Sequence, residues 1–119
     1  MTTPEVARRL VTLCREQKWE AAQRELYADD AVSIEPQETP MSPKVTTGLP
    51  NLIAKGRQFV AMVDTMHALT ISEPIVAPQS FACTMALDVT FKGQPRMKMA
   101  ELCVYEVKDG KIVSEQFHA

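Results

Sequence analysis

The sequence predicts an α+β fold in which helices pack against one face of a curved antiparallel sheet. In the first half of the chain, apolar residues recur at helical spacing. The second half contains long strand-like runs, and Asp109-Gly110 separates the last two of them. Asp-Gly is a preferred pair for the two-residue turn of a β-hairpin. Helices followed by hairpin-connected strands are typical of the α+β class, and 119 residues predict one domain, residues 1–119.

Three helices are expected. The first covers about residues 4–17 and follows Thr3, whose hydroxyl is a good N-cap. The second covers about residues 19–27, and the third about residues 49–66. Gly56 falls in the middle of the third helix, where glycine costs about 1 kcal/mol relative to alanine. Close packing or a pocket wall would explain a glycine at that place.

The expected strands are short in the first half and long in the second. A short strand, residues 31–35, ends at Pro36. The proline-rich segment 37–47 is expected to be an extended loop, of the kind that often forms a lid or the mouth of a pocket. The remaining strands are expected at residues 69–76, 80–91, 96–107 and 112–119.

Two turns set the expected registers. The Asp109-Gly110 turn joins the last two strands, and the turn at residues 92–95 joins the two before. Regular antiparallel pairing outward from each turn then fixes which side chains share a face. A slip of one residue in the 92–95 turn would move the strand before it to the opposite face. The expected pairs include Leu102–Phe117, Glu101–His118, Val89–Lys98 and Leu87–Ala100.

These registers divide the strand residues between two faces. The face expected to meet the helices is strongly apolar and contains one acid, Glu115. A carboxyl group in an apolar cavity must be paired, hydrogen-bonded or protonated, and its pKa should rise. The opposite face mixes apolar and polar side chains, which suggests a subunit interface. Its members include Met97, Met99, Glu101, Cys103, Tyr105, Gln116 and His118.

Composition excludes several classes of partner. A net charge of −2 and a pI near 5.7 give no electrostatic basis for binding nucleic acid or an anionic membrane. The first residues show no apolar signal-peptide core. Cys14, Cys83 and Cys103 are widely spaced within apolar stretches. This pattern is typical of reduced core thiols in a cytoplasmic protein.

The candidate catalytic groups are Glu35 and Glu115, with His67 from the end of the third helix. Two carboxyl groups in one pocket of low dielectric constant cannot both ionise cheaply, so one would donate a proton and the other accept one. The alternative is a structural role, with Glu35 paired to Lys44 or Lys55 and Glu115 bonded to Tyr27 or Trp19. No metal site is expected, because Glu101 with His118 offers too few ligands. No cofactor is expected either, since phosphate-loop and dinucleotide motifs are missing from the sequence.

Two segments carry a resemblance to a known family: LYADDAVSIEP at residues 26–36 and VYEVKDGKIVSEQF at residues 104–117. With the order of helices and strands, they make the chain similar to the nuclear transport factor 2-like superfamily, in its SnoaL-like and ketosteroid-isomerase-like branch. The resemblance implies a cystatin-like cone, in which three N-terminal helices and a curved sheet enclose a deep, mostly apolar pocket. It also implies a homodimer joined through the outer sheet face.

The resemblance also bears on the chemistry. Ketosteroid isomerases place their catalytic base just before the proline of the first strand, where this chain has Glu35. Their two donors to the enolate oxygen would fall at Leu102 and at Leu10 or Val11, so both are expected to be missing. Loss of one such donor costs about 100- to 1000-fold in rate. This argues against steroid isomerisation by that mechanism.

The expected function is therefore broad. The first hypothesis is cofactor-free acid/base catalysis of the isomerase, cyclase, dehydratase or hydrolase type, on a small apolar molecule similar to a polyketide or steroid. The second is a non-catalytic ligand-binding or dimerisation module of the same fold. Besides the candidate catalytic groups, the residues expected to line the pocket are Trp19, Tyr27, Phe59, Val60, Val63, Met85, Leu87, Val89, Leu102, Val104 and Phe117.

Overall fold

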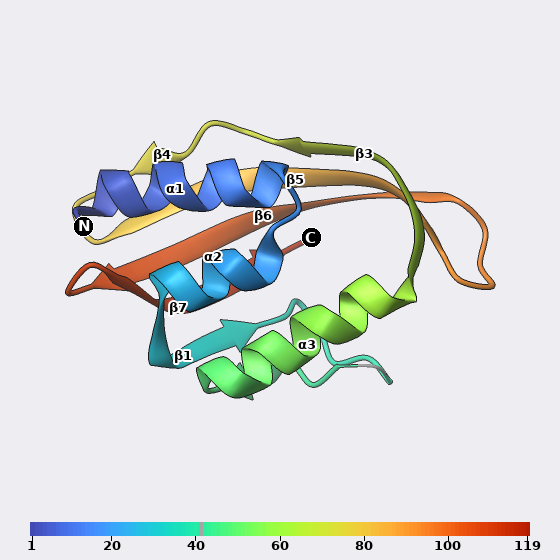
Figure 1. The fold of residues 1–119 in the computed structure, drawn as a ribbon, viewed down its shortest axis with the longest axis horizontal. Coiled ribbons are helices and arrows are strands. Elements are labelled where there is room, and N and C mark those ends of the chain that lie inside the picture. Colours follow the sequence, from blue (N-terminus) through green and yellow to red (C-terminus); the bar gives the residue numbers. More distant parts are fainter. Residues whose placement is uncertain (41) are drawn as a thin grey trace.

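The computed structural model describes residues 1–40 and 42–119 and confirms the α+β class. Three helices lie on one face of a single curved sheet: α1 (Thr3–Arg15), α2 (Trp19–Leu26) and α3 (Leu49–Met62) (Figure 1). Position 41, in the middle of the loop expected at residues 37–47, is outside the described residues. The strands are β1 (Tyr27–Ile34), β2 (Val45–Thr47), β3 (Val63–Ile71), β4 (Ile75–Val76), β5 (Ser80–Phe91), β6 (Met97–Lys108) and β7 (Lys111–His118).

The sheet contains one parallel pair. Its strand order is β2-β1-β7-β6-β5-β3, with β4 also paired to β5. Strands β1 and β7 run parallel, whereas the other pairs are antiparallel. A hairpin cannot produce this parallel contact, because β1 and β7 are connected through almost the whole domain. The sheet is therefore mostly antiparallel, as predicted, but its one parallel pair was not predicted.

The three helices form where predicted, but their ends differ. The N-cap of α1 is Thr2 rather than Thr3, and it forms a capping box with Glu5. Helix α3 ends at Met62, four residues earlier than expected. From Val63 onward the chain pairs with β5 instead, because its residues then join the sheet. His67 consequently lies within a strand and not after a helix.

The Asp109-Gly110 turn forms as predicted, but the register beyond it is wrong by one residue. Both turn residues have positive φ, 53° and 75°, and Val107 pairs with Ile112. A β-bulge then follows in β7, where Val113 is an extra residue. The pairs after it are Glu106–Ser114, Tyr105–Glu115, Cys103–Phe117 and Leu102–His118.

The register between β5 and β6 is also one residue away from the prediction. Leu87 pairs with Met99 rather than with Ala100. The two slips have the same consequence for β6, because a shift of one residue moves every side chain to the other face. Five members that were predicted to face outward line the cavity instead: Met97, Met99, Glu101, Cys103 and Tyr105. Leu102, expected inside, is 42% exposed.

The core lies between α1, α2 and the inner face of the sheet. It contains Val6 and Leu10 of α1, Leu26 of α2 and Ile112 of β7, all at most 2% exposed. A stacked pair of rings, Phe81 of β5 and Tyr105 of β6, joins these strands with centroids 4.8 Å apart. None of the helices in the part of the chain that the structure describes is long and apolar enough to cross a membrane.

Candidate functional site

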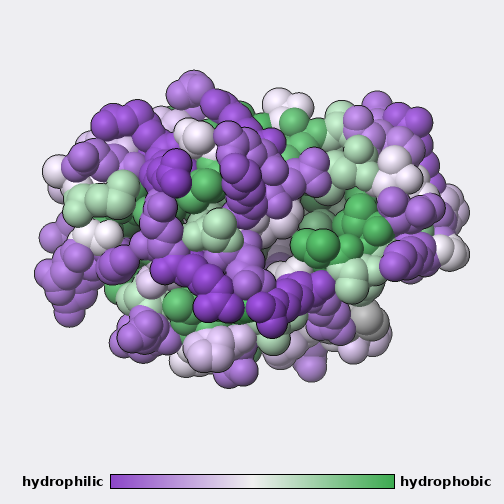
Figure 2. Space-filling model, in the orientation of Figure 1, coloured by the Kyte–Doolittle hydropathy of each residue, from purple (hydrophilic) through white to green (hydrophobic). Residues whose placement is uncertain are grey.

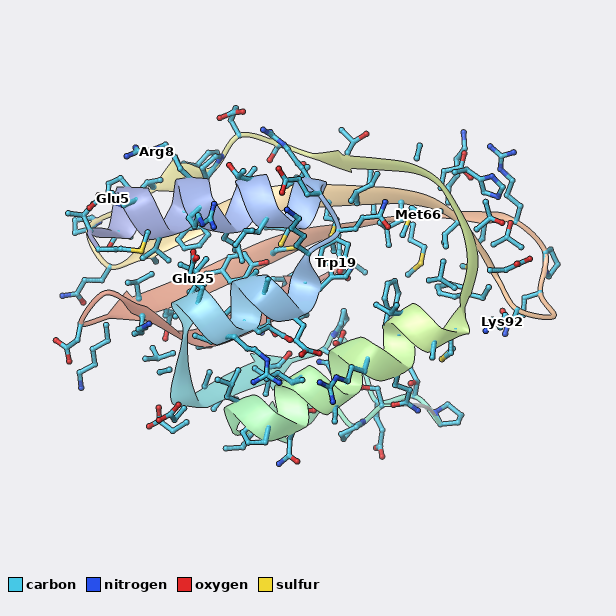
Figure 3. The ribbon with its side chains drawn as sticks, viewed as in Figure 1. Glu5, Arg8, Trp19, Glu25, Met66 and Lys92 are labelled. Atoms are coloured by element: carbon cyan, nitrogen blue, oxygen red, sulfur yellow. The ribbon has the colours of Figure 1, made fainter. Side chains whose placement is uncertain are left out.

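A cavity of about 750 Å³ lies between the helices and the inner face of the sheet. Leu10 of α1, Trp19 of α2 and Phe59 of α3 contribute to its helical wall. Trp19 is at the beginning of α2 (Figure 3). Apolar atoms gather between α3 and the long strands on the face that Figure 2 shows. The volume is typical of a small-molecule site.

The structure brings together about half of the residues expected to line the pocket. Trp19, Tyr27, Phe59, Met85, Leu87 and Phe117 line the cavity, as do Glu35 and Glu115.

The other expected lining residues lie elsewhere. Val60 is 52% exposed and does not line the cavity, and Val89 is fully buried outside it. Leu102 and Val104 face away because of the register of β6. Val63 begins β3 and does not line the cavity either.

Glu115 is the most buried acid of the cavity, with 6% exposure. The hydroxyl of Tyr27 donates a hydrogen bond of 2.6 Å to its Oε2 atom. Burial raises the pKa of Glu115, while hydrogen bonds from Tyr27 and Ser33 and the charge of Lys55 oppose that rise. The pKa of Glu115 is raised overall, so its carboxyl group stays neutral to a higher pH than an ordinary glutamate does.

Glu35 forms an ion pair with Lys55 of α3. The Nζ atom of Lys55 lies 2.7 Å from Oε1 of Glu35 and 2.8 Å from the hydroxyl oxygen of Ser33. It also lies 5.8 Å from the centre of the Phe117 ring. The structural contacts that the sequence offered as alternatives, Glu35 with Lys55 and Glu115 with Tyr27, are therefore both present. They do not remove either carboxyl from the cavity wall.

Glu101 is the acid that the sequence analysis assigned to the wrong face. It lines the cavity from β6, opposite Met85 of β5. Burial raises the pKa of Glu101 to about 7, with further contributions from the negative charges of Glu35 and Glu115, and Lys55 opposes the rise. Its carboxyl group therefore changes protonation near neutral pH.

This position also corrects the comparison with the isomerases. The predicted register placed Leu102 where those enzymes have an acid, so the acid was expected to be missing. The neighbouring residue, Glu101, points inward instead. The helix-one positions Leu10 and Val11 remain apolar, as expected from the sequence.

His67 does not belong to the cavity. It lies in β3, is exposed, and its Nε2 atom is 2.8 Å from the hydroxyl oxygen of Thr90. His67 was expected directly at the end of the third helix, but α3 already ends at Met62, and His67 lies within β3.

Gln23 of α2 is a further polar group of the wall that the sequence analysis did not single out. Its Nε2 atom donates to the carbonyl oxygen of Leu52 at 3.3 Å. Its Oε1 atom is buried and has no hydrogen-bond partner within residues 1–40 and 42–119. Gly56 of α3 lies opposite, where a Cβ atom would be 3.6 Å from this oxygen. The mid-helix glycine thus leaves the amide of Gln23 free of a covering side chain.

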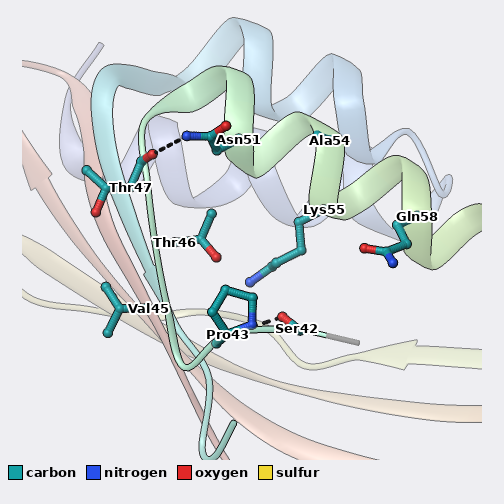
Figure 4. Close-up of a pocket in the computed structure, with 9 residues that line it drawn as sticks. All are labelled: Ser42, Pro43, Val45, Thr46, Thr47, Asn51, Ala54, Lys55 and Gln58. Atoms are coloured by element: carbon teal, nitrogen blue, oxygen red, sulfur yellow. Dashed lines mark hydrogen bonds between the residues drawn. The ribbon is translucent and has the colours of Figure 1, made fainter. Parts of the chain in front are cut away.

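A smaller pocket of about 410 Å³ lies on the other side of Lys55, between α3 and the segment leading into β2 (Figure 4). Asn51 donates to the carbonyl oxygen of Thr47 at 2.9 Å at one end of it. The side chain of Lys55 lines both this pocket and the main cavity. Lys55 is thus part of the partition between the two.

Three carboxyl groups line the cavity in different environments, and one of them, Glu35, is ion-paired with Lys55. Within the described part of the chain, no group of three or more His, Cys, Asp or Glu side chains is arranged to hold a metal ion. Carboxyl groups are side chains that can donate or accept a proton.

Comparison with known proteins identifies the family and agrees with the fold. The family model of the SnoaL-like domain matches residues 1–119. A Mesorhizobium loti protein, described as a candidate SnoaL-like polyketide cyclase and carbohydrate phosphatase, is 32% identical, with a TM-score of 0.92 and full coverage of both chains. No curated protein matches the chain.

Two more distant structures share the fold and contain bound molecules. One is a Mycobacterium tuberculosis protein in complex with estradiol-17β-hemisuccinate, 17% identical, with a TM-score of 0.73 and coverage of 100% of this chain and 95% of that one. The other is a Catenulispora acidiphila protein with a ketosteroid isomerase-like fold in complex with trimethylamine, 18% identical, with a TM-score of 0.75 and coverage of 99% and 87%.

Proposed function

Because the chain belongs to the SnoaL-like family, whose model spans residues 1–119, we propose that it is a cofactor-free acid/base enzyme acting on a small, largely apolar carbonyl compound. The observation that carries this proposal is Glu101, whose carboxyl has a pKa of about 7 and lines the same cavity as Glu35. General acid/base catalysis works best when the pKa of the group is close to the working pH. The reaction would be of the isomerase, cyclase, dehydratase or hydrolase type.

Different environments divide the roles between the carboxyl groups. Glu35, which is paired with the ammonium group of Lys55, takes the proton from a carbon next to the carbonyl group of the substrate. Glu101, whose proton the charge of Glu35 helps to retain, donates to the carbonyl oxygen as negative charge develops there. Glu115 is an orienting or second acid group, which the hydroxyl of Tyr27 holds in place.

The wall of the cavity supports a ligand of mixed character. Most of the lining is apolar or aromatic, which suits a polyketide-like or steroid-like skeleton. The Oε1 atom of Gln23 has no hydrogen-bond partner among the described residues. It favours a hydroxyl or amino group on the ligand, because a buried acceptor gains from a donor. A relative at 17% identity was crystallised with a steroid derivative, which is consistent with this choice of ligand.

Hydrogen–deuterium exchange tests the proposal. A panel of cyclic ketones and a 3-ketosteroid would be incubated with the protein in D₂O, and loss of the proton next to the carbonyl group would be followed by NMR. We expect Glu101→Gln and Glu35→Gln to lower the enzyme-dependent exchange rate by about 100-fold or more. Glu106→Gln is the matched control, since Glu106 is exposed on the same strand as Glu101 and should leave the rate unchanged.

The alternative is a ligand-binding module without catalysis. It is favoured by the contacts that already satisfy two of the acids, Glu35 with Lys55 and Glu115 with Tyr27. Estradiol binding, measured by fluorescence or calorimetry, distinguishes the two. Binding together with no accelerated exchange for any ketone would favour the module and reject the enzyme.

We also propose that the protein is a homodimer joined through the outer face of the sheet. The corrected register gives that face Leu102, which is 42% exposed, with Gln116 and His118 on β7. The residues of β6 that line the cavity are no longer part of the proposed interface: Met97, Met99, Glu101, Cys103 and Tyr105. Sedimentation analysis of wild type and Leu102→Glu tests it: a dimer that the variant converts to monomer is expected, and a monomeric wild type would reject it.

A further inference from the structure

Two thiol groups face each other in the wall of the cavity. Cys83 of β5 is directly opposite Cys103 of β6. Both side chains are buried, with exposures of 6% and 1%, and both residues line the cavity. The proposed acid/base chemistry assigns no role to either thiol.

The strand geometry suits a covalent link. Directly opposite residues of an antiparallel pair have Cα atoms about 4.5 or 5.5 Å apart, depending on the type of pair. Both spacings lie within the range of about 4.4 to 6.8 Å that a disulfide requires. The two side chains also point to the same face of the sheet, since both reach the same cavity. We propose that Cys83 and Cys103 form a redox-active dithiol, which hydrogen peroxide entering the cavity oxidises to a cross-strand disulfide.

The surroundings of the three thiols indicate which one reacts first. A hydrogen bond with Cys103 lowers the pKa of Cys83, as does the positive charge of Arg15, although burial opposes them. The same hydrogen bond, together with burial, raises the pKa of Cys103. Burial raises the pKa of Cys14 to about 12. Because the thiolate is the nucleophile, Cys83 attacks and Cys103 resolves.

The reaction balances in two steps. The sulfur of Cys83 attacks one oxygen of hydrogen peroxide, the O–O bond breaks, and a sulfenic acid and one water form. The sulfur of Cys103 then attacks the sulfur of Cys83, the S–O bond breaks, and a second water leaves with the thiol proton of Cys103. The two thiols lose two hydrogen atoms in total, and the peroxide is reduced to two molecules of water. Dithiothreitol reverses the change by thiol–disulfide exchange.

The disulfide would also affect the proposed catalytic site. Glu101 lies two residues before Cys103 on β6 and therefore on the same face. Tyr105 lies two residues after Cys103, and its ring stacks on Phe81, two residues before Cys83. A covalent bond at this level of the sheet would fix β5 and β6 to each other directly beside Glu101.

Mass spectrometry of the folded protein tests the inference. After treatment with hydrogen peroxide and denaturation without reductant, the wild type should lose about 2 Da and regain it with dithiothreitol. Digestion with trypsin should then yield peptide 58–92 joined to peptide 99–108, since these contain Cys83 and Cys103. Cys14→Ser is the matched control and should show the same loss of mass, whereas Cys83→Ser and Cys103→Ser should not.

Three results would overturn the inference. One is a wild-type protein that keeps its mass or gains oxygen without a link. Another is a link between peptide 10–15, which contains Cys14, and peptide 58–92. The third is a loss of about 2 Da that persists in Cys103→Ser. The peptide map uses the wild type alone, so it decides the matter even if a serine variant fails to fold.

Discussion

Glu101 is a carboxyl group whose burial should make the folded protein sensitive to neutral pH. In the folded state its pKa rises from 4.5 to about 7, mainly because burial disfavours the charged form. The raised pKa means that the folded protein binds more protons than the unfolded chain between these two values. Its contribution to stability is therefore fully present below about pH 4.5, falls as the pH rises through 7, and is lost above it.

The size of the effect follows from the displacement of the pKa. At about 1.4 kcal/mol for each pH unit, a change from 4.5 to about 7 corresponds to at most about 3.4 kcal/mol. Because the Glu101 side chain is partly exposed and solvent screens its charge, we expect about 2 kcal/mol. Glu101→Gln removes the ionisable group and keeps its shape. The variant should therefore be about 2 kcal/mol more stable than the wild type at pH 8.5, with little difference at pH 4.5.

Urea denaturation at a series of pH values measures this difference. Glu106→Gln is the control, because Glu106 is on the same strand and faces solvent. Glu115 titrates in the same direction, so some pH dependence should remain in Glu101→Gln. The reasoning fails if Glu101→Gln and the wild type lose stability in parallel between pH 4.5 and 8.5, or if the substitution destabilises the protein at pH 8.5.

Two further predictions concern Tyr27 and the turn glycines. Tyr27→Phe removes the donor to Glu115 and should lower the free energy of unfolding, measured by urea denaturation, by about 1–3 kcal/mol. The loss should be larger at pH 8 than at pH 5, because the lost hydrogen bond favours the ionised acid. An unchanged stability at pH 8 would contradict this. Gly110→Ala and Gly93→Ala each place a side chain at positive φ, which should destabilise the protein by about 1 kcal/mol in each case. Gly110→Ala should be the more destabilising of the two, because its Cβ would be 2.8 Å from the backbone oxygen of Met1 whereas Gly93 faces open space; equal losses would contradict the difference.

Local signals in the sequence predicted most of the fold. The spacing of apolar residues placed all three helices, and the Asp109-Gly110 turn formed with the predicted positive φ values. The helices and this turn depend on residues that are close in sequence, so the sequence alone carries enough information about them. Glu35 lines the cavity, a place that the resemblance to the ketosteroid isomerases implied.

The face of β6 could not be predicted in the same way, because it depends on a bulge and a turn without strong sequence signatures. An extra residue at Val113 changes the register with β7, and the 92–95 turn sets the register with β5. One signal did point to the observed register. Cys103, Tyr105 and Val107 alternate as apolar residues, which favours their burial on one face. Following that alternation back along the strand would have brought Glu101 inside.

Deletion of Val113 tests whether the bulge is the reason that Glu115 faces the cavity. In the observed structure Val107 pairs with Ile112 and Glu106 with Ser114, so removing the extra residue should keep both pairs. The variant should fold and keep Glu115 buried, with the raised pKa detectable by NMR titration of its side chain. In a regular hairpin without a bulge, the same deletion would turn Glu115 outward. A folded variant in which Glu115 titrates like an exposed glutamate would therefore show that the bulge is wrongly placed.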